Sequence, residues 1–264
     1  MGNVTQIVFI LVSFFASVIG CICGIGGGVI IKPVLDAFGL YSVSTISFMS
    51  GCIVLSMTTY SVLKAKLANE SVIEKGVSTW LGIGAAAGGL LGKQLFDMVK
   101  SLFENANTVG AVQAAALLLV TLGTAVYTVN KGKIQTIRVE HSLVCLVIGL
   151  TLGVMSSFLG IGGGPINLVM LYYFFSMETK VAAQNSLYII FFSQMASLLF
   201  TIISGKVPQF PLGLCACMVC CGILGGVVGR KVNKKIDSQT VNKLFLGLMV
   251  VIMGICCYNF VQYC

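Results

Sequence analysis

The chain is a succession of long apolar segments separated by short polar loops. Six of these segments have about the 20 residues that an α-helix needs to cross a bilayer. They are Ser42–Leu63, Gly76–Phe96, Thr108–Val129, Val181–Ser204, Phe210–Gly229 and Thr240–Phe260. The pattern predicts an all-α polytopic membrane protein. The first apolar run, Val4–Cys23, lacks a basic start and a small-residue cleavage site, so we interpret it as a retained helix.

Two further apolar segments, Val4–Phe38 and Ser142–Phe175, are too long for a single crossing. As straight helices each would exceed roughly 50 Å, whereas the hydrocarbon core is about 30 Å thick. Both carry the phrase Gly-Ile-Gly-Gly-Gly near the middle, at Gly24–Gly28 and Gly160–Gly164. Each Gly lowers helix stability by about 1 kcal/mol relative to Ala. We therefore expect each long segment to divide there into a pair of shorter helices.

The two halves of the chain repeat one another beyond this phrase. Gly88–Lys93 (GGLLGK) matches Gly225–Arg230 (GGVVGR), and Leu117–Tyr127 aligns with Leu248–Tyr258. Three motifs in the same order indicate an internal duplication. The predicted repeats are residues 1–130 and 131–264, joined in one membrane domain.

Basic residues indicate the topology, because loops on the cytoplasmic side are enriched in Lys and Arg. If each broken segment crosses once, giving eight crossings, the basic residues divide almost evenly between the two sides. With ten crossings, one side keeps only Lys32, Lys93, Lys100 and Lys206 of the 16 basic residues. Five crossings per half is an odd number, so this reading predicts two inverted repeats, each a glycine-broken helix pair plus three further helices. Both termini are then expected outside.

Composition narrows the function. Charged residues are only 9% of the chain, against roughly 25% in a soluble domain, which indicates a membrane protein. The net charge of +8 comes from short loops between apolar segments, as the positive-inside rule predicts, so no nucleic-acid partner is expected. The single histidine, His141, lies in the linker between the halves, and no nucleophile–base constellation is present. The run Cys215-x-Cys217-x-x-Cys220-Cys221 has no His, Asp or Glu nearby in the sequence. We therefore expect these cysteines to pack as small hydrophobic side chains and not to form a metal site. We expect neither an enzyme nor a cofactor.

The glycine phrases are the first candidates for a site. Matching breaks in two halves of a membrane protein are typical of the binding site of a secondary transporter. Backbone N–H groups at the start of a helix favour an anion. The candidate backbone ligands are Gly24, Gly26, Gly27, Gly28, Gly160, Gly162, Gly163 and Gly164. Helix packing is the alternative role of glycine, which we assign to Gly88, Gly92, Gly225 and Gly229. Pro33 and Pro165 suit the beginning of the second short helix in each pair.

Lys32 is the candidate counter-charge, one turn after the first glycine run. A charge at membrane depth costs about 2.5–3.5 kcal/mol on insertion scales and is a functional candidate by default. Two alternatives stay open, which are pairing with Asp36 and extension to the membrane interface. The equivalent position in the second half is Leu168.

Polar side chains at membrane depth supply candidate hydrogen-bond donors. Asn167, Gln184 and Asn185 are predicted to orient the anion, with interhelical hydrogen bonding as the alternative. Further members of this class are Ser44, Thr45, Ser47, Ser156, Ser157, Ser186 and Gln194.

These motifs together resemble the TauE/SafE sulfite exporter family, also called the toluene sulfonate uptake permease family. The resemblance covers essentially the whole chain and rests on Gly24–Gly28, Gly160–Gly164, Pro33, Pro165 and the repeated GG-x-x-G-[KR]. It implies a transporter of sulfur-containing oxyanions such as sulfite, thiosulfate or small organosulfonates in the cell inner membrane. The second half departs from the first in having Asn167-Leu168 where the first has Ile31-Lys32.

We therefore predict a secondary transporter that binds such an anion between the two broken helices and works by alternating access. A passive anion channel with the same glycine-lined site is the alternative. The expected partners are the anion and the lipid bilayer, with coupling to protons or to the membrane potential. The sequence leaves a homodimer open, as well as the direction of transport.

Overall fold

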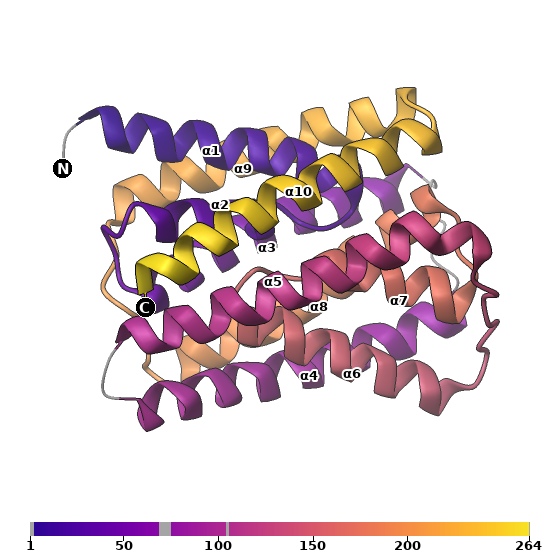
Figure 1. Ribbon diagram of the computed structural model, residues 1–264, viewed down its shortest axis with the longest axis horizontal. Helices are drawn as coiled ribbons and strands as arrows, with labels where there is room; N and C mark the ends of the chain where they lie inside the picture. Colours follow the sequence, from indigo (N-terminus) through magenta and orange to yellow (C-terminus); the bar gives the residue numbers. More distant parts are fainter. Residues whose placement is uncertain (1–2, 69–74, 104–105, 264) are drawn as a thin grey trace.

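The computed structural model describes residues 3–68, 75–103 and 106–263, and all regular structure within them is helical (Figure 1). The first half contains α1 (Asn3–Cys23), α2 (Gly28–Ala37), α3 (Val43–Leu67), α4 (Lys75–Leu102) and α5 (Ala106–Asn130). A short 3-10 turn, Lys131–Lys133, begins the linker. The second half contains α6 (Ser142–Leu159), α7 (Pro165–Phe175), α8 (Thr179–Ile203), α9 (Leu212–Lys235) and α10 (Ser238–Tyr263). The all-helical prediction is confirmed.

The length and surface of the helices fit a lipid environment. Seven helices of the described residues are long and apolar enough to cross a membrane, namely α1, α3, α5, α6, α8, α9 and α10. Large apolar side chains face outward, such as Leu67 at 80% and Ile203 at 82% exposure. A surface of this kind is stable only against lipid, so the chain is a multi-pass membrane protein.

Both long apolar segments divide at their glycine phrase, as predicted. The backbone φ is +74° at Gly24 and Gly26, and +66° and +75° at Gly160 and Gly162. Glycine adopts this left-handed region without the steric cost that a side chain brings. The first three residues of the phrase therefore break both helices alike, after which Gly27 turns helical at a φ of −70° while Gly163 and Gly164 keep positive φ values of +131° and +147°.

The short helices after the breaks are shorter than the sequence implied. α2 has 10 residues and α7 has 11, so they extend about 15 and 17 Å, roughly half of the hydrocarbon thickness. The count of ten full crossings therefore stays a prediction. Pro165 begins α7 as expected. The expectation for Pro33 is wrong, because this proline lies inside α2, where Asn259 Nδ2 donates to its carbonyl at 2.8 Å.

The helices of one half pack mainly against those of the other in a matched arrangement. α4 lies along α6 as α9 lies along α1, while α3 contacts α8 and α5 contacts α10. In Figure 1, α1 and α6 run in opposite directions and both chain ends lie at the same end of the bundle. Glycines make the closest approaches: a Cβ on Gly88 would lie 2.1 Å from the carbonyl oxygen of Leu150, and one on Gly225 would lie 2.5 Å from that of Phe14. The predicted packing role of these glycines is confirmed.

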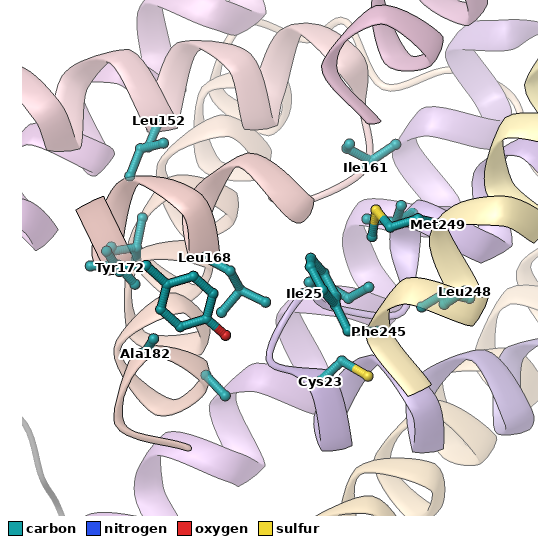
Figure 2. Packing of buried hydrophobic residues seen from close by; sticks show 14 of the residues in the cluster. Cys23, Ile25, Leu152, Ile161, Leu168, Tyr172, Ala182, Phe245, Leu248 and Met249 are labelled. Carbon is teal, nitrogen blue, oxygen red and sulfur yellow. The ribbon is translucent and has the colours of Figure 1, made fainter. Parts of the chain in front are cut away.

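The largest apolar cluster surrounds the two breaks (Figure 2). Ile25 and Ile161, the isoleucines of the two phrases, are 0% and 1% exposed. Leu168, Phe245 and Met249 pack into the same cluster. Burial of these side chains holds the irregular backbone at the centre of the bundle.

Candidate anion-binding cavity

The two glycine runs meet each other. A Cβ on Gly28 would lie 2.1 Å from the carbonyl oxygen of Ile161, and one on Gly26 would lie 3.8 Å from that of Gly162. We call the two runs, Gly24–Gly28 and Gly160–Gly164, the glycine crossing. The sequence predicted that these breaks belong to one site, and the structure brings them into direct contact.

A cavity of about 490 Å³ leads from one end of the bundle to the glycine crossing. It lies among the start of α3, the end of α4 and the end of α8, at the end of the bundle that holds both termini (Figure 1). Ser47, Ser157 and Gly160 line its inner part, and Lys93, Lys100 and Lys206 line it nearer the opening. We call it the large cavity. Of the predicted glycines, Gly160 lines it.

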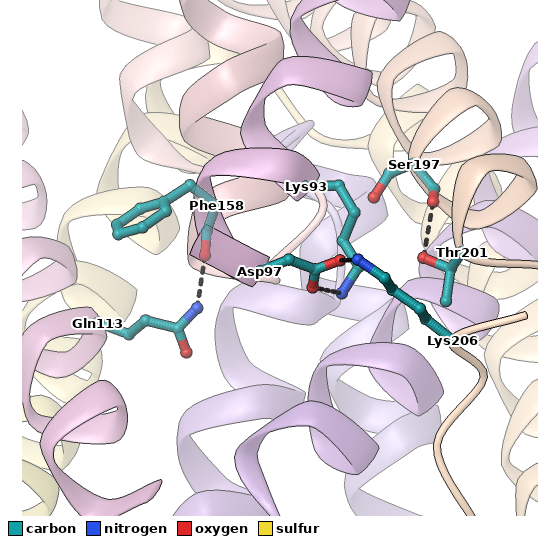
Figure 3. Close-up of polar contacts among 7 residues, drawn as sticks. All are labelled: Lys93, Asp97, Gln113, Phe158, Ser197, Thr201 and Lys206. Atoms are coloured by element: carbon teal, nitrogen blue, oxygen red, sulfur yellow. Dashed lines mark hydrogen bonds and ion pairs between the residues drawn. The ribbon is translucent and has the colours of Figure 1, made fainter. Parts of the chain in front are cut away.

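The opening of the large cavity is basic. Lys93 Nζ lies 3.1 Å from Asp97 Oδ1 and Lys206 Nζ lies 3.2 Å from Asp97 Oδ2 (Figure 3). Lys100 also lines the cavity, so three lysines face one aspartate and the formal charge of the lining is positive. Lys93 Nζ also lies 4.6 Å from the centre of the Phe96 ring. We call Lys93, Asp97 and Lys206 the lysine clasp.

Hydroxyl and amide groups surround the inner part of the large cavity. Gln194 Nε2 donates to Ser156 Oγ at 3.4 Å, and the hydroxyls of Ser157 and Ser193 lie 3.3 Å apart. Ser47 Oγ is buried without a hydrogen-bond partner, next to Gly160. Groups of this kind donate to an oxyanion without adding charge to the membrane interior.

Lys32 is paired with Asp36 across 2.7 Å, and the two side chains are 4% and 6% exposed. This is one of the two alternatives that the sequence left open. The Cε atom of Lys32 lies 3.2 Å from the Cβ position of Gly160, so the ion pair borders the glycine crossing. Lys32 itself lines a separate cavity of only about 10 Å³. Its role as an anion ligand stays a prediction.

The three predicted amides occupy different environments. Asn167 is fully buried beside Gly163, and neither of its amide atoms has a hydrogen-bond partner. Asn185 accepts a hydrogen bond from Ser78 Oγ at 2.6 Å, which links α8 to α4. Gln184 lines a cavity of about 40 Å³ toward the opposite end of the bundle. The structure thus places only Asn167 at the glycine crossing.

Sequence reasoning missed the lysine clasp. A usable signal existed, because Lys93 ends the GGLLGK motif and is followed by Asp97 at the i,i+4 spacing that joins neighbouring turns. Lys206 could not be found this way, since its approach to Asp97 depends on how the α8–α9 loop folds over α4.

The cysteine run on α9 divides between the interior and the surface. Cys215 is buried, whereas Cys217 and Cys220 are exposed. Within the described residues, no group of three or more His, Cys, Asp or Glu side chains is placed to hold a metal ion.

Broken helices that meet beneath a basic cavity, within a bundle of long apolar helices, define a multi-pass membrane protein of the transporter class. The model of the family described as "Sulfite exporter TauE/SafE" matches residues 9–255, and the chain belongs to this family. It is also similar to the "Probable membrane transporter protein YunE" of Bacillus subtilis (strain 168), with 23% identity over 223 residues, 76% of this chain and 80% of the relative. No solved structure gives a significant match.

Proposed function

We propose that this protein is a secondary transporter that moves a sulfur-containing oxyanion, such as sulfite, thiosulfate or a small organosulfonate, across the cytoplasmic membrane. The observation that carries the proposal is the large cavity, which is basic at its opening and ends at the glycine crossing. Positive lining charge in a cleft with low-dielectric walls concentrates anions. The family supplies the substrate class.

The lysine clasp gives the anion a place to enter. The carboxylate of Asp97 already lies between the ammonium groups of Lys93 and Lys206, where it occupies the position that an oxyanion would take. An incoming anion displaces this carboxylate and then moves to the hydroxyls of Ser47 and Ser157 beside Gly160. There the backbone N–H groups of Gly26–Gly28 and Gly162–Gly164, together with Lys32 and Asn167, would complete its coordination.

The orientation follows from the basic residues. The large cavity is lined by Lys93, Lys100 and Lys206. In a topology with ten crossings, these are three of the four basic residues on the side of the membrane that has fewer Lys and Arg residues. By the positive-inside rule this side is outside, together with both termini. The matched packing and opposite directions of the two halves support inverted repeats, whose relative motion gives alternating access. Export of an anion is also favoured by a cytoplasm-negative potential, at about 2.3 kcal/mol per charge per 100 mV.

A channel is the rival function, and the packing of the glycine crossing favours a carrier over it. Gly28 and Ile161 leave no room even for a methyl group. Beyond them, the cavity toward the opposite end is only about 40 Å³. A cavity that is open at one end and closed by packed backbone at its base fits one state of an alternating-access cycle.

Counterflow in proteoliposomes tests the proposal. Labelled sulfite, thiosulfate and a small sulfonate are each presented outside vesicles preloaded with the unlabelled compound. A carrier gives saturable exchange of one of them, inhibited by the others. Flux that rises without saturation would replace the carrier by a channel, and an absence of flux for all three would remove this substrate class.

Substitution of Lys93 tests the site. Lys93→Gln removes one partner of the clasp, and a charge-assisted hydrogen bond contributes about 1.5–3 kcal/mol, so we expect the KM for exchange to rise about tenfold or more. Lys133→Gln, in the linker turn away from the cavity, is the matched control and should leave KM unchanged. An unchanged KM in Lys93→Gln would remove the clasp from the anion path.

A further inference from the structure

Resting on the transport function proposed above, we propose that the small cavity beside Arg230 is the second mouth of the anion path, captured here in its closed state. This small cavity lies at the opposite end of the bundle from the large cavity and measures about 40 Å³. The polar and charged side chains that line it belong to Ser61, Gln184, Arg230, Asn233 and Lys234.

The two cavities are built from equivalent positions of the two halves. The shift of 136 residues that relates Gly24 to Gly160 also relates Ser61 to Ser197, and the shift of 137 residues in the GG-x-x-G-[KR] motif relates Arg230 to Lys93. Applied to all ten residues that line the small cavity, these shifts reach residues of the large cavity in every case except Leu187. The small cavity is therefore the repeat-related counterpart of the large cavity.

The contacts at the glycine crossing follow the same relation. A Cβ on Gly160 would lie 2.5 Å from Ser47 Oγ, and a Cβ on Gly24 would lie 2.3 Å from the Cα of Ala183, the residue equivalent to Ser47. Each glycine run thus packs on the third helix of the other half. Because the glycines pack on equivalent residues while the cavity volumes differ about twelvefold, the two halves hold different conformations around one pseudo-symmetric centre.

Specific hydrogen bonds keep the small cavity closed. Arg230 Nη1 donates to the carbonyl oxygen of Ser61 at 3.1 Å, which ties α9 to α3. Asn233 Nδ2 donates to the carbonyl oxygen of Ile22 at 2.6 Å, which ties α9 to α1. Cys21 Sγ and Ser61 Oγ lie 3.5 Å apart. When α9 moves away from α1 and α3, these bonds break and the cavity opens.

The chemistry of the small cavity suits an oxyanion. Arg230 stands where the large cavity has Lys93, and Lys234 stands where it has Asp97, so the described residues place two cations in the lining of the small cavity. A guanidinium group presents paired N–H donors that match two oxygens of one oxyanion. An exchange of conformation between the halves would open this mouth as the large cavity closes.

Paired cysteine substitutions at Ser61 and Ser197 test the inference, in a background whose native cysteines are replaced. A charged, membrane-impermeant methanethiosulfonate reagent is added to either face of oriented vesicles, at rest and during saturating exchange of a small organosulfonate, which does not react with the reagent. If the cavity beside Arg230 is a mouth that is closed at rest, its open state has a population below about 10% in the resting protein. During exchange the protein alternates between its two states, and the population of this open state rises toward one half. The modification rate of Ser61→Cys should then rise about fivefold or more at the face opposite the large cavity, while that of Ser197→Cys falls.

Neutralisation of Arg230 gives a second readout. Arg230→Gln should slow exchange about tenfold or more, Arg230→Lys should restore part of it, and Lys231→Gln, on the exposed neighbouring position, should leave it unchanged. Normal exchange in Arg230→Gln, or exchange by the Ser61→Cys protein without a change in its modification rate, would overturn the second mouth while the transport function stands. An absence of exchange in the unmodified protein would instead overturn the proposed function.

Discussion

Replacement of Gly28 by Ala should destabilise the protein by pushing the two broken helices apart. The added Cβ would lie 2.1 Å from the carbonyl oxygen of Ile161, 2.8 Å from its carbonyl carbon and 2.9 Å from Val54 Cγ2. Ordinary contact begins near 3.4 Å, so the first of these contacts is 1.3 Å too short. The obstacle is backbone in the second glycine run, and no rotation of a side chain relieves it.

The expected cost follows from overpacking in a dense interior. Insertion of one carbon into a packed core costs about 1–3 kcal/mol, and a clash with backbone belongs at the upper end. A gain of about 1 kcal/mol from the higher helix propensity of Ala offsets part of it. At about 2–4 °C per kcal/mol for a chain of this size, the thermal midpoint in detergent should fall by about 5 °C. Exchange in proteoliposomes should fall as well.

Two glycines provide matched controls for Gly28→Ala. A Cβ on the adjacent Gly27 would lie 3.1 Å from Ser17 Oγ and 3.2 Å from the backbone N and Cα of Ser17, a deficit of about 0.2–0.3 Å, and the φ of −70° at Gly27 suits Ala. Gly123, inside α5, has no atom within 4 Å of its Cβ position. Gly27→Ala should cost clearly less than Gly28→Ala, because its deficit is a few tenths of an ångström, and Gly123→Ala should be neutral or stabilising. If Gly28→Ala matches Gly123→Ala in midpoint and in exchange, the close approach of the two glycine runs is refuted.

Three further results are expected. Lys32→Met leaves the buried carboxylate of Asp36 without its partner and should lower the free energy of unfolding by about 3–5 kcal/mol. If the double variant Lys32→Met/Asp36→Leu recovers both the thermal midpoint and exchange, Lys32 is structural. A persistent loss of exchange in the double variant supports the role of Lys32 as an anion ligand. Gly163→Ala, at a φ of +131° and with Ile190 Cγ1 2.4 Å from the Cβ position, should lower the midpoint more than Gly27→Ala does. Hydrogen bonds from Thr240 Oγ1 and from backbone amides hold the pKa of Asp237 below its usual range. The ionised Asp237 therefore stabilises the start of α10 fully above the ordinary carboxyl pKa, and this stabilisation is lost as the pH falls through the lowered pKa. Asp237→Asn should flatten this acid dependence of the thermal midpoint.

The candidate site was only partly predictable. The glycine phrases were found because a glycine run inside an apolar segment has no purpose in an uninterrupted helix. The complete lysine clasp was not found, because only the Lys93–Asp97 pair lies within α4, while Lys206 approaches Asp97 from a loop 109 residues away along the chain. Asn185 illustrates the same limit, since its polarity marked it as a ligand but the fold uses it to bond Ser78 of α4.

The sequence by itself determined the apolar helices, the repeated motifs and the position of both breaks. These are properties of local patterns, and apolar length and glycine content act on the chain wherever it folds. Only the tertiary structure decided that Gly28 meets Ile161, that Lys206 approaches Asp97, and that the cavity lined by Lys93 measures about 490 Å³ while the cavity beside Arg230 measures about 40 Å³. These features depend on which helices pack together, and packing joins residues more than a hundred positions apart, beyond the reach of any local pattern.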